Sequence, residues 1–352
     1  MQIDFHHAVT YVVARLAGFS PAEADIVVYS AQYVDDATDE GIIEFSSGAL
    51  FHRISSAHKM LDYRNSEELG NHRVWLPFHF LPGNDGLPAG ANPDGSFINK
   101  IICRPNSHVA RDMVRDCIDQ SHRPYALHRL GITMHVYADT WAHQGFAGVN
   151  HKINEASSLV SNDSDFDIRF TDKIVNFFID KAFPLGHGTV LSYPDQPHLK
   201  WEYNNAYGRL IVRDNPADFI DAAGHMYHVM RAYREGVSLP DFDRIGRIPD
   251  VDRDTMIRFL QNTTSKEGEK RHRVWLDAVG IGEFSFGAET VHYDPDEKLW
   301  KTQALGGKKW TGQLPYSEDF LHSNWKLFHD ALLAHRFAII HEILPQYGIC
   351  AA

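Results

Sequence analysis

The sequence predicts a mainly α-helical fold with long irregular loops. Two observations support this prediction. Apolar residues recur at helical spacing along much of the chain, and capping signals mark where helices begin. Hydrophobic residues make up 43% of the 352 positions and aromatic residues 12%, which is enough to bury a substantial ordered core.

The first two helices have the clearest signals. Residues 6–17 carry three valines and a leucine on one apolar face. The segment Ser-Pro-Ala-Glu at 20–23 is a capping box with proline at the first helical position, so a second helix should run from 21 to about 34.

Further along the chain, a proline at position 124 marks the start of a helix over 124–143. Residues 71–106 are rich in Pro, Gly and Asn and are expected to form a long, ordered, irregular segment between helices. Aromatic, Gly and Pro residues over 184–210 and 284–316 indicate loops with a short hairpin. Two arrangements fit: a metal-binding core at 1–183 with a helical extension at 184–352, or one continuous domain. The remaining helices are expected at 41–62, 107–120, 150–160, 171–182, 214–235, 252–265 and 317–344.

Composition limits the function classes. The net charge of −12 disfavours nucleic-acid binding through phosphate contacts. No run of residues approaches the roughly 20 apolar positions that cross a bilayer, and the N-terminus lacks the cationic start of a signal peptide. Cytoplasmic location is expected, with export by another route left open. Three cysteines are too few and too scattered for a disulfide framework or a thiolate zinc site: Cys103, Cys117 and Cys350.

Histidine is the unusual residue, at 22 of 352. Histidine is the commonest side-chain metal ligand, so the positions of these residues decide whether a metal site is expected. Three of them, His198, His272 and His292, stand in polar surroundings and are expected at the surface.

The strongest metal signal lies in the helix predicted at 124–143. His128, His135, Asp139 and His143 fall on one face roughly 80° wide. His135 and Asp139 are four residues apart and can meet at one ion. Apolar neighbours wall this face, which suits zinc or a similar divalent ion. The alternative is a helix with buried, hydrogen-bonded histidines.

Weaker signals surround this helix. His151 and Glu155 are again four apart, and glycines between the two segments would return this pair toward His143. Asp35 and Asp36 end the second helix, where acidic side chains oppose the helix dipole and a cation would compensate them; a solvated turn is the alternative.

Two further candidates lie upstream. His79 sits in the aromatic segment PFHFLPGND, where a core histidine is the alternative to a ligand. His6 and His7 stand before the first helix, with Asp4 alongside.

The order of these residues resembles the family of zinc-dependent phospholipases C and single-strand-specific zinc nucleases, over residues 1–155. The family pattern is an N-terminal ligand, an early His, an Asp, a His in an aromatic-Pro-Asp segment, then His-x3-Asp, His and His-x3-Glu. The matching positions here are Met1 or Asp4, His6 or His7, Asp35 or Asp36, His79, His135 with Asp139, His143, and His151 with Glu155.

The resemblance implies an all-helical bundle with two or three zinc ions. His79, His135, Asp139 and Asp35 or Asp36 would hold one ion. His143, His151 and Glu155 would hold a second, and His6 or His7 would join Asp139 at a third. Zinc lowers the pKa of bound water toward about 7 for attack on a phosphate ester, and Asp35 or Asp36 could orient or deprotonate that water.

The chain departs from the family pattern at two points. Met1 stands where family enzymes present a processed tryptophan, so the third site is altered, taken by Asp4, or missing. The loop between Asp139 and His143 is shorter than expected. The chain also resembles a bacterial family, within or near this superfamily, that shares the DFH start and the segment YADTWAHQGF.

The second half offers a loop that could complete a pocket. His187 lies between two glycines, and Asp195 and Trp201 follow in a Pro-rich stretch. A packing loop stiffened by proline is the alternative. His329-Asp330 resembles the doublet of another metal phosphohydrolase class, but no Asp follows it. No Gly-x-Ser-x-Gly or Walker motif occurs.

Two functional classes remain. The first is a zinc-dependent hydrolase acting on a small phosphoester or a phospholipid head group, with nucleic acid a weaker candidate. The second is a non-catalytic metalloprotein in which the ions hold the helices together and the second half of the chain binds a partner. An open coordination position beside a pocket would favour the enzyme.

Overall fold

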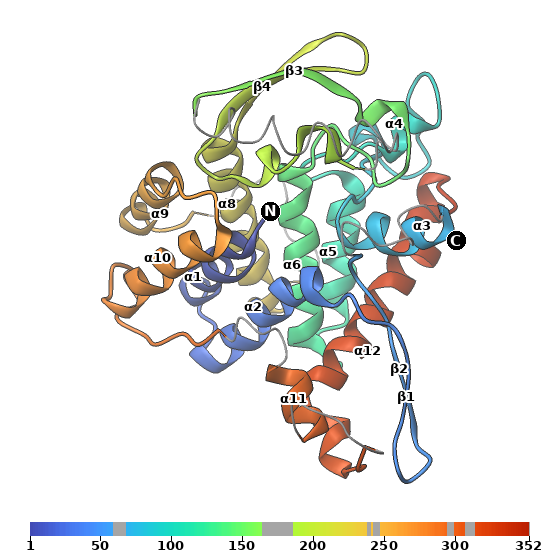
Figure 1. Cartoon of the computed structure of the whole chain (residues 1–352), viewed down its shortest axis with the longest axis vertical. Coiled ribbons are helices and arrows are strands. Elements are labelled where there is room, and N and C mark those ends of the chain that lie inside the picture. The colour runs from blue at the N-terminus through green and yellow to red at the C-terminus, as the bar shows by residue number, and fades with distance from the viewer. Residues whose placement is uncertain are drawn as a thin grey trace.

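The helix α6 (Ala126–Ala142) lies at the centre of the molecule (Figure 1). Only Leu127 of its residues is not classed as buried, so α6 is covered on every side. Helices α2 (Pro21–Asp36), α5 (His108–Asp119), α8 (Asn215–Glu235) and α12 (Asn324–Phe337) pack around it. The computed structural model describes residues 1–58, 68–163, 186–237, 241, 247–293, 299–306 and 314–351.

The mainly α prediction is confirmed. The other helices are α1 (Thr10–Leu16), α3 (Glu68–Phe78), α4 (Ile98–Ile101), α9 (Asp250–Asn262), α10 (Gly268–Gly280) and α11 (Leu299–Leu305). A π-helical turn, Asp4–Val9, leads into α1, and a second, Ala338–Ile343, follows α12. The strands are β1 (Gly41–Glu44), β2 (Leu50–Arg53), β3 (Ala156–Ser161), β4 (Lys200–Asn205) and β5 (Leu210–Asp214), in an antiparallel pair β1–β2 and an antiparallel sheet β3-β4-β5.

Helix α2 begins as its sequence predicts. The Ser20 hydroxyl accepts a hydrogen bond from the Glu23 backbone N–H at 3.3 Å, and Glu23 accepts one from the Ser20 backbone at 2.8 Å. This reciprocal cap satisfies donors that a helix start otherwise leaves unpaired.

Helices α2 and α6 cross unusually closely at Gly131. A Cβ atom at this position would lie 2.2 Å from the Val27 carbonyl oxygen and 2.6 Å from the Ser30 Cβ. Only glycine therefore allows this approach. One turn further along α6, His135 faces the last two turns of α2.

The helix predicted at 41–62 is wrong over its described part, which forms the β1–β2 hairpin. Gly41 and Gly48 have φ of +99° and +82°, values that no L-residue helix contains. The β-branched residues Ile42 and Ile43 between them favour a strand.

The helix predicted at 150–160 is also wrong. Asn154 bonds through its side chain to the backbone of Ala147 and Val149, at distances of 2.8 to 2.9 Å, and this holds a turn. Residues 156–161 then pair with β4, about 45 residues away in sequence, which local periodicity does not reveal. The segment 171–182 lies outside the described residues.

Other expectations have mixed outcomes. The short hairpin expected within 184–210 is present as β4 and β5, extending to Asp214. Helices α3, α4, α10 and α11 were not predicted, and α11 lies within the segment 284–316 that was expected to form loops. The main hydrophobic cluster includes Phe5, Met134, Phe219, Trp275 and Ile339, so it draws on residues from both sides of position 183. In the described part of the chain, no helix combines the length and apolar character needed to span a membrane.

Candidate metal centre

Side chains from five segments meet beside α6. The segments are the N-terminal turn, the end of α2, the residue after α3, the last turns of α6, and the loop after residue 186. The side chains they contribute are those of His6, Asp35, His79, His135, Asp139, His143, His187 and Asp195.

Asp139 is the hub of this cluster and is 1% exposed. Its Oδ1 lies 2.7 Å from the Met1 amine and 3.2 Å from His6 Nε2. Its Oδ2 lies 3.4 Å from His79 Nδ1 and 3.3 Å from His135 Nε2. Both carboxylate oxygens are thus surrounded by nitrogen atoms.

Hydrogen bonds to backbone carbonyls fix the two rings that face Asp139 Oδ2. His135 donates from Nδ1 to the Ala31 carbonyl at 2.8 Å, and His79 donates from Nε2 to the Ser56 carbonyl at 2.9 Å. A carbonyl only accepts, so in a neutral ring the other nitrogen carries a lone pair. These two nitrogens, His79 Nδ1 and His135 Nε2, face each other at 3.3 Å. Opposed lone pairs need a cation or a proton between them.

A second group forms around Asp195. His143 Nε2 lies 3.6 Å from Asp195 Oδ1, and His187 Nε2 lies 3.6 Å from Asp195 Oδ2. Each ring donates from Nδ1 to a carbonyl, His143 to His79 at 2.7 Å and His187 to Leu191 at 2.6 Å. This carbonyl-anchored orientation is the usual arrangement behind metal-bound histidine.

Burial holds two of these histidines, His135 and His187, in the neutral form. Burial, reinforced by neighbouring His6, lowers the pKa of His135 well below 6.5. Burial also lowers the pKa of His187 to about 4, although Asp195 opposes the shift. A neutral imidazole is the form that binds metal.

The carboxyl groups and the amine respond to one another. Burial raises the pKa of Asp35, and the negative charge of Asp139 raises it further. Burial acts in the same direction on Asp139, but His143, the Met1 amine and His135 hold its pKa well below 3.8. Burial acts to lower the pKa of the Met1 amine, but Asp139 and Asp195 raise it to about 11. The carboxylates of this centre therefore stabilise a positive charge placed among them.

Three buried atoms test whether metal ions fit here. Within the described residues, His6 Nε2, Asp139 Oδ2 and Asp195 Oδ1 have no hydrogen-bond partner. Leaving such atoms buried without a hydrogen bond costs about 1–3 kcal/mol each. Imidazole nitrogen and carboxylate oxygen are ligands that zinc binds, so the residues fit zinc or a similar divalent ion.

The model of a protein family described as "Family of unknown function (DUF6765)" matches residues 1–343. The chain belongs to the DUF6765 family. No curated protein and no solved structure matches it.

The sequence left two choices between adjacent residues open, and the structure places the two members of each pair in different surroundings. In this DUF6765 chain His6 faces Asp139, whereas His7 Nδ1 lies 2.9 Å from His272 Nε2. Asp35 reaches the centre, with its Oδ1 3.8 Å from His79 Nδ1. Asp36 instead accepts hydrogen bonds from Gln32 and Tyr293. His7 and Asp36 are therefore corrected to positions outside the cluster.

The predicted ligands His151 and Glu155 are also corrected. His151 accepts a hydrogen bond from the Ile153 backbone at 3.0 Å and caps a short turn, and Glu155 is exposed. His187 and Asp195, predicted as pocket residues, stand where a second ion would need them. Their eight-residue spacing across irregular turns has no helical period, so the sequence pattern could not mark them as a ligand pair.

Three other expectations fail in the aromatic and polar core. Trp201 is 2% exposed and donates to Asn215 at 2.9 Å, so it packs in the core rather than lining a pocket. Asp4 pairs with Arg271 at 2.6 Å instead of joining the centre. His198 and His272 are each 5% exposed, not at the surface.

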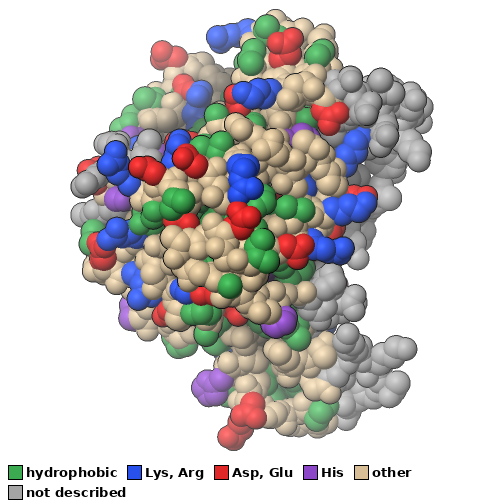
Figure 2. Space-filling view, turned by 90° about the vertical axis from the view of Figure 1, so that its left-hand side faces the viewer, with side chains coloured by type: hydrophobic (Ala, Val, Ile, Leu, Met, Phe, Trp, Pro, Cys, Tyr) green, Lys and Arg blue, Asp and Glu red, His purple; other side chains and the backbone are tan. Residues whose placement is uncertain are grey.

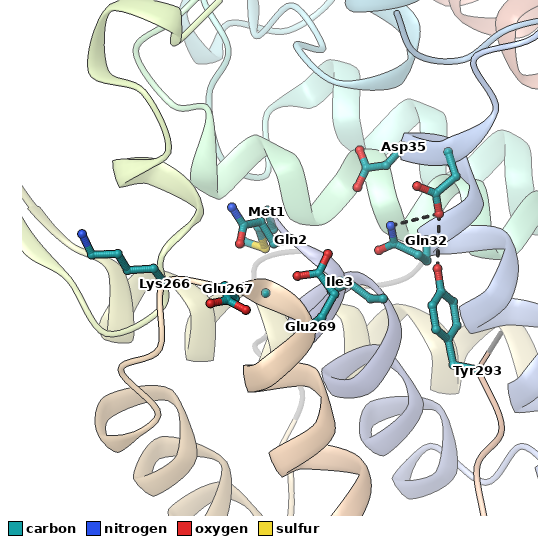
Figure 3. A pocket seen from close by; sticks show the side chains of 11 residues that line it. Met1, Gln2, Ile3, Gln32, Asp35, Lys266, Glu267, Glu269 and Tyr293 are labelled. Atoms are coloured by element: carbon teal, nitrogen blue, oxygen red, sulfur yellow. Dashed lines mark hydrogen bonds between the residues drawn. The ribbon is translucent and has the colours of Figure 1, made fainter. Parts of the chain in front are cut away.

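A cleft of about 500 Å³ opens beside the centre (Figure 3). Met1 and Asp35 belong to both the cleft lining and the cluster. The Asp35 side chain keeps 31% of its surface exposed, while that of Asp139 keeps 1%. Asp35 is thus the most exposed carboxylate of the centre, ahead of Asp195 at 12%. The rest of the lining is Gln2, Ile3, Gln32, Asp36, Lys266, Glu267, Gly268, Glu269 and Tyr293.

Proposed function

We propose that this protein is a zinc-dependent hydrolase that cleaves a small phosphoester or a phospholipid head group. One observation carries the proposal: buried ligand atoms without hydrogen-bond partners in the described chain lie beside a cleft that Asp35 lines. Metal ions bound here would be reachable from the cleft, which is the condition for catalysis rather than a closed structural site.

The proposed ligand sets follow the distances. The first ion would be held by Asp35, His79, His135 and Asp139. The second would be held by His143, His187 and Asp195. His6 and the second oxygen of Asp139 offer a third position. Zinc bound at such sites would lower the pKa of coordinated water toward about 7 and would polarise a phosphoryl oxygen.

Asp35 has the best position for a direct role in the reaction. Its carboxyl borders both the centre and the cleft, so it can orient or deprotonate a water that approaches from the cleft. Asp36, expected in the same role, is engaged by Gln32 and Tyr293. Asp139 is too deeply buried to meet a substrate.

Surface charge supports a small substrate over a long nucleic acid. On the face seen in Figure 2, the basic side chains of the described residues are mixed with acidic ones and form no continuous patch. Phosphate-backbone binding requires clustered Lys and Arg.

The test combines metal analysis with hydrolysis. Purified protein should contain at least two zinc ions per chain by elemental analysis and should hydrolyse bis(p-nitrophenyl) phosphate. Asp35→Asn should lower kcat by roughly 10²-fold or more, the range for a lost general base. Asp94→Asn makes the same change at an exposed position and should leave kcat unchanged. Bound zinc without hydrolysis of any phosphoester would favour the structural role instead.

A further inference from the structure

The cleft beside the metal centre has an acidic lining. Asp35, Asp36, Glu267 and Glu269 contribute carboxyl groups, against the ammonium groups of Lys266 and of the Met1 N-terminus. The Met1 amine is already paired with Asp139 and Asp195 at the metal centre. Glu267 also pairs with Lys270 at 2.8 Å, outside the lining. Acidic residues alone do not define a site, because exposed carboxylates are readily solvated.

A buried amide supplies the second observation. Gln32 lines the cleft and is 6% exposed. Its Nε2 donates to Asp36 Oδ2 at 3.2 Å, which fixes the amide so that Oε1 is the remaining acceptor. Oε1 is buried and has no hydrogen-bond partner in the part of the chain that the structure describes. A ligand that donates an N–H or O–H would satisfy it.

Helix α2 sets the spacing between this acceptor and the metal centre. Gln32, Asp35 and Asp36 stand at positions i, i+3 and i+4, so their Cβ atoms are roughly 5–6 Å apart on one face. Asp35 marks the metal side of the cleft, and Gln32 lies one turn away. A two- or three-carbon linker spans this separation.

The opposite wall is the start of α10. A helix N-terminus ordinarily attracts anions, but Glu267 and Glu269 already stand there and cancel that preference. In Figure 3 the side chain of Glu269 extends from α10, and that of Gln32 extends from α2, into the cleft. The ring of Tyr293 lines it as well.

We propose that the cleft selects a phosphoester whose alcohol carries a protonated primary amine. This inference rests on the proposed function for the phosphate end of the substrate. The ammonium group donates to Gln32 Oε1 and faces the carboxylates of Asp36 and Glu269. A primary ammonium is specified over a quaternary one because only the former has an N–H for Gln32.

The test uses the zinc-loaded full chain and matched chromogenic diesters. We expect kcat/KM for p-nitrophenyl 2-aminoethyl phosphate to exceed that for p-nitrophenyl propyl phosphate, whose propyl group carries no ammonium, by roughly tenfold or more, the effect of one charge-assisted hydrogen bond. The quaternary p-nitrophenyl phosphocholine should fall between them.

Variants assign the preference to the cleft. Gln32→Leu should lower the ratio of the two kcat/KM values by about tenfold. Glu269→Gln alters an exposed side chain, so it should fold normally and lower the ratio severalfold. Glu44→Gln removes the same charge from the β1 strand and should leave the ratio unchanged. A ratio near one in the unmodified protein, or an unchanged ratio in both cleft variants, overturns the proposal.

A binding measurement separates this inference from the proposed function. If no phosphodiester is hydrolysed, the function fails, and calorimetry with O-phosphoethanolamine and propyl phosphate then decides the inference alone. Tighter binding of O-phosphoethanolamine that Glu269→Gln reduces would support the cleft assignment. Equal affinities would overturn it.

Discussion

Two buried histidines on α6 allow a matched test of the metal centre. His135 is 0% exposed and faces Asp139, whereas His128, two turns earlier, is 3% exposed and lies 3.1 Å from the Asn324 side-chain oxygen. Replacing either with alanine removes a buried ring and a hydrogen bond of that ring. The hydrogen bond alone contributes about 1 kcal/mol to stability. Only His135→Ala should remove a metal ligand.

The expected size of the effect follows from binding linkage. Zinc at a free concentration 100-fold above its Kd stabilises the folded state by about 2.7 kcal/mol. Unfolding entropy is about 2.1 cal/mol/K per residue, or roughly 0.74 kcal/mol/K for 352 residues, so Tm should rise by about 4 °C. If His135→Ala weakens binding about 100-fold, the gain falls to about 0.4 kcal/mol and the shift to under about 1 °C.

The assay is thermal unfolding at a buffered free-zinc concentration, compared with the same protein in excess chelator. The unmodified chain and His128→Ala should both show the zinc-dependent rise in Tm, even though His128→Ala starts from a lower Tm. His135→Ala should lose most of that rise. Equal zinc shifts in the two variants would refute His135 as a ligand and, with it, the centre built on Asp139.

Further predictions test the second ion, a core histidine and the helix crossing. His187→Ala should lose about one zinc per chain by elemental analysis, and His151→Ala none; the reverse would restore the ligand set predicted from sequence. Burial, with the charges of Arg53 and Lys301, lowers the pKa of His329 to about 3, so the unfolded chain binds a proton that the folded chain does not between pH 6.5 and about 3. Stability therefore decreases as the pH is lowered through that window. Between pH 7 and pH 5 the free energy of urea unfolding of the unmodified chain should drop by about 2 kcal/mol more than that of His329→Leu; equal losses would contradict this. Gly131→Ala should overpack the α2–α6 crossing, lower Tm by roughly 1–4 °C and weaken zinc binding, whereas Gly280→Ala, with open space around its Cβ, should do neither.

Helical periodicity allowed the candidate ligands on α6 to be predicted together. Because 3.6 residues make a turn, His135 and Asp139 must share a face wherever the helix lies, and their distance of 3.3 Å follows from that rule. His143, at the C-cap, remains close enough to join the second group. Such local geometry is contained in the sequence itself.

The long-range part of the centre could not be read in the same way. His187 and Asp195 reach α6 through irregular turns, including Leu191 with a φ of +53°, that no residue pattern encodes. The same limit explains the failed His151–Glu155 assignment. That pair has helical spacing, but Asn154 between them ends the turn through its bonds to Ala147 and Val149, and Glu155 faces solvent.

The adjacent acids at the end of α2 link the metal centre to the cleft. Two carboxylates at a helix C-terminus oppose the helix dipole, so each needs separate compensation. Asp35 lies within 3.8 to 3.9 Å of His79 and His135, where a divalent cation would neutralise it. Asp36 accepts hydrogen bonds from Gln32 and Tyr293 and thereby leaves the Gln32 oxygen as an open acceptor in the cleft. Asp36, which lies outside the proposed ligand sets, thus orients the Gln32 amide at the position where the substrate's amine would be recognised. The end of α2 would then set the distance between the metal centre and that position.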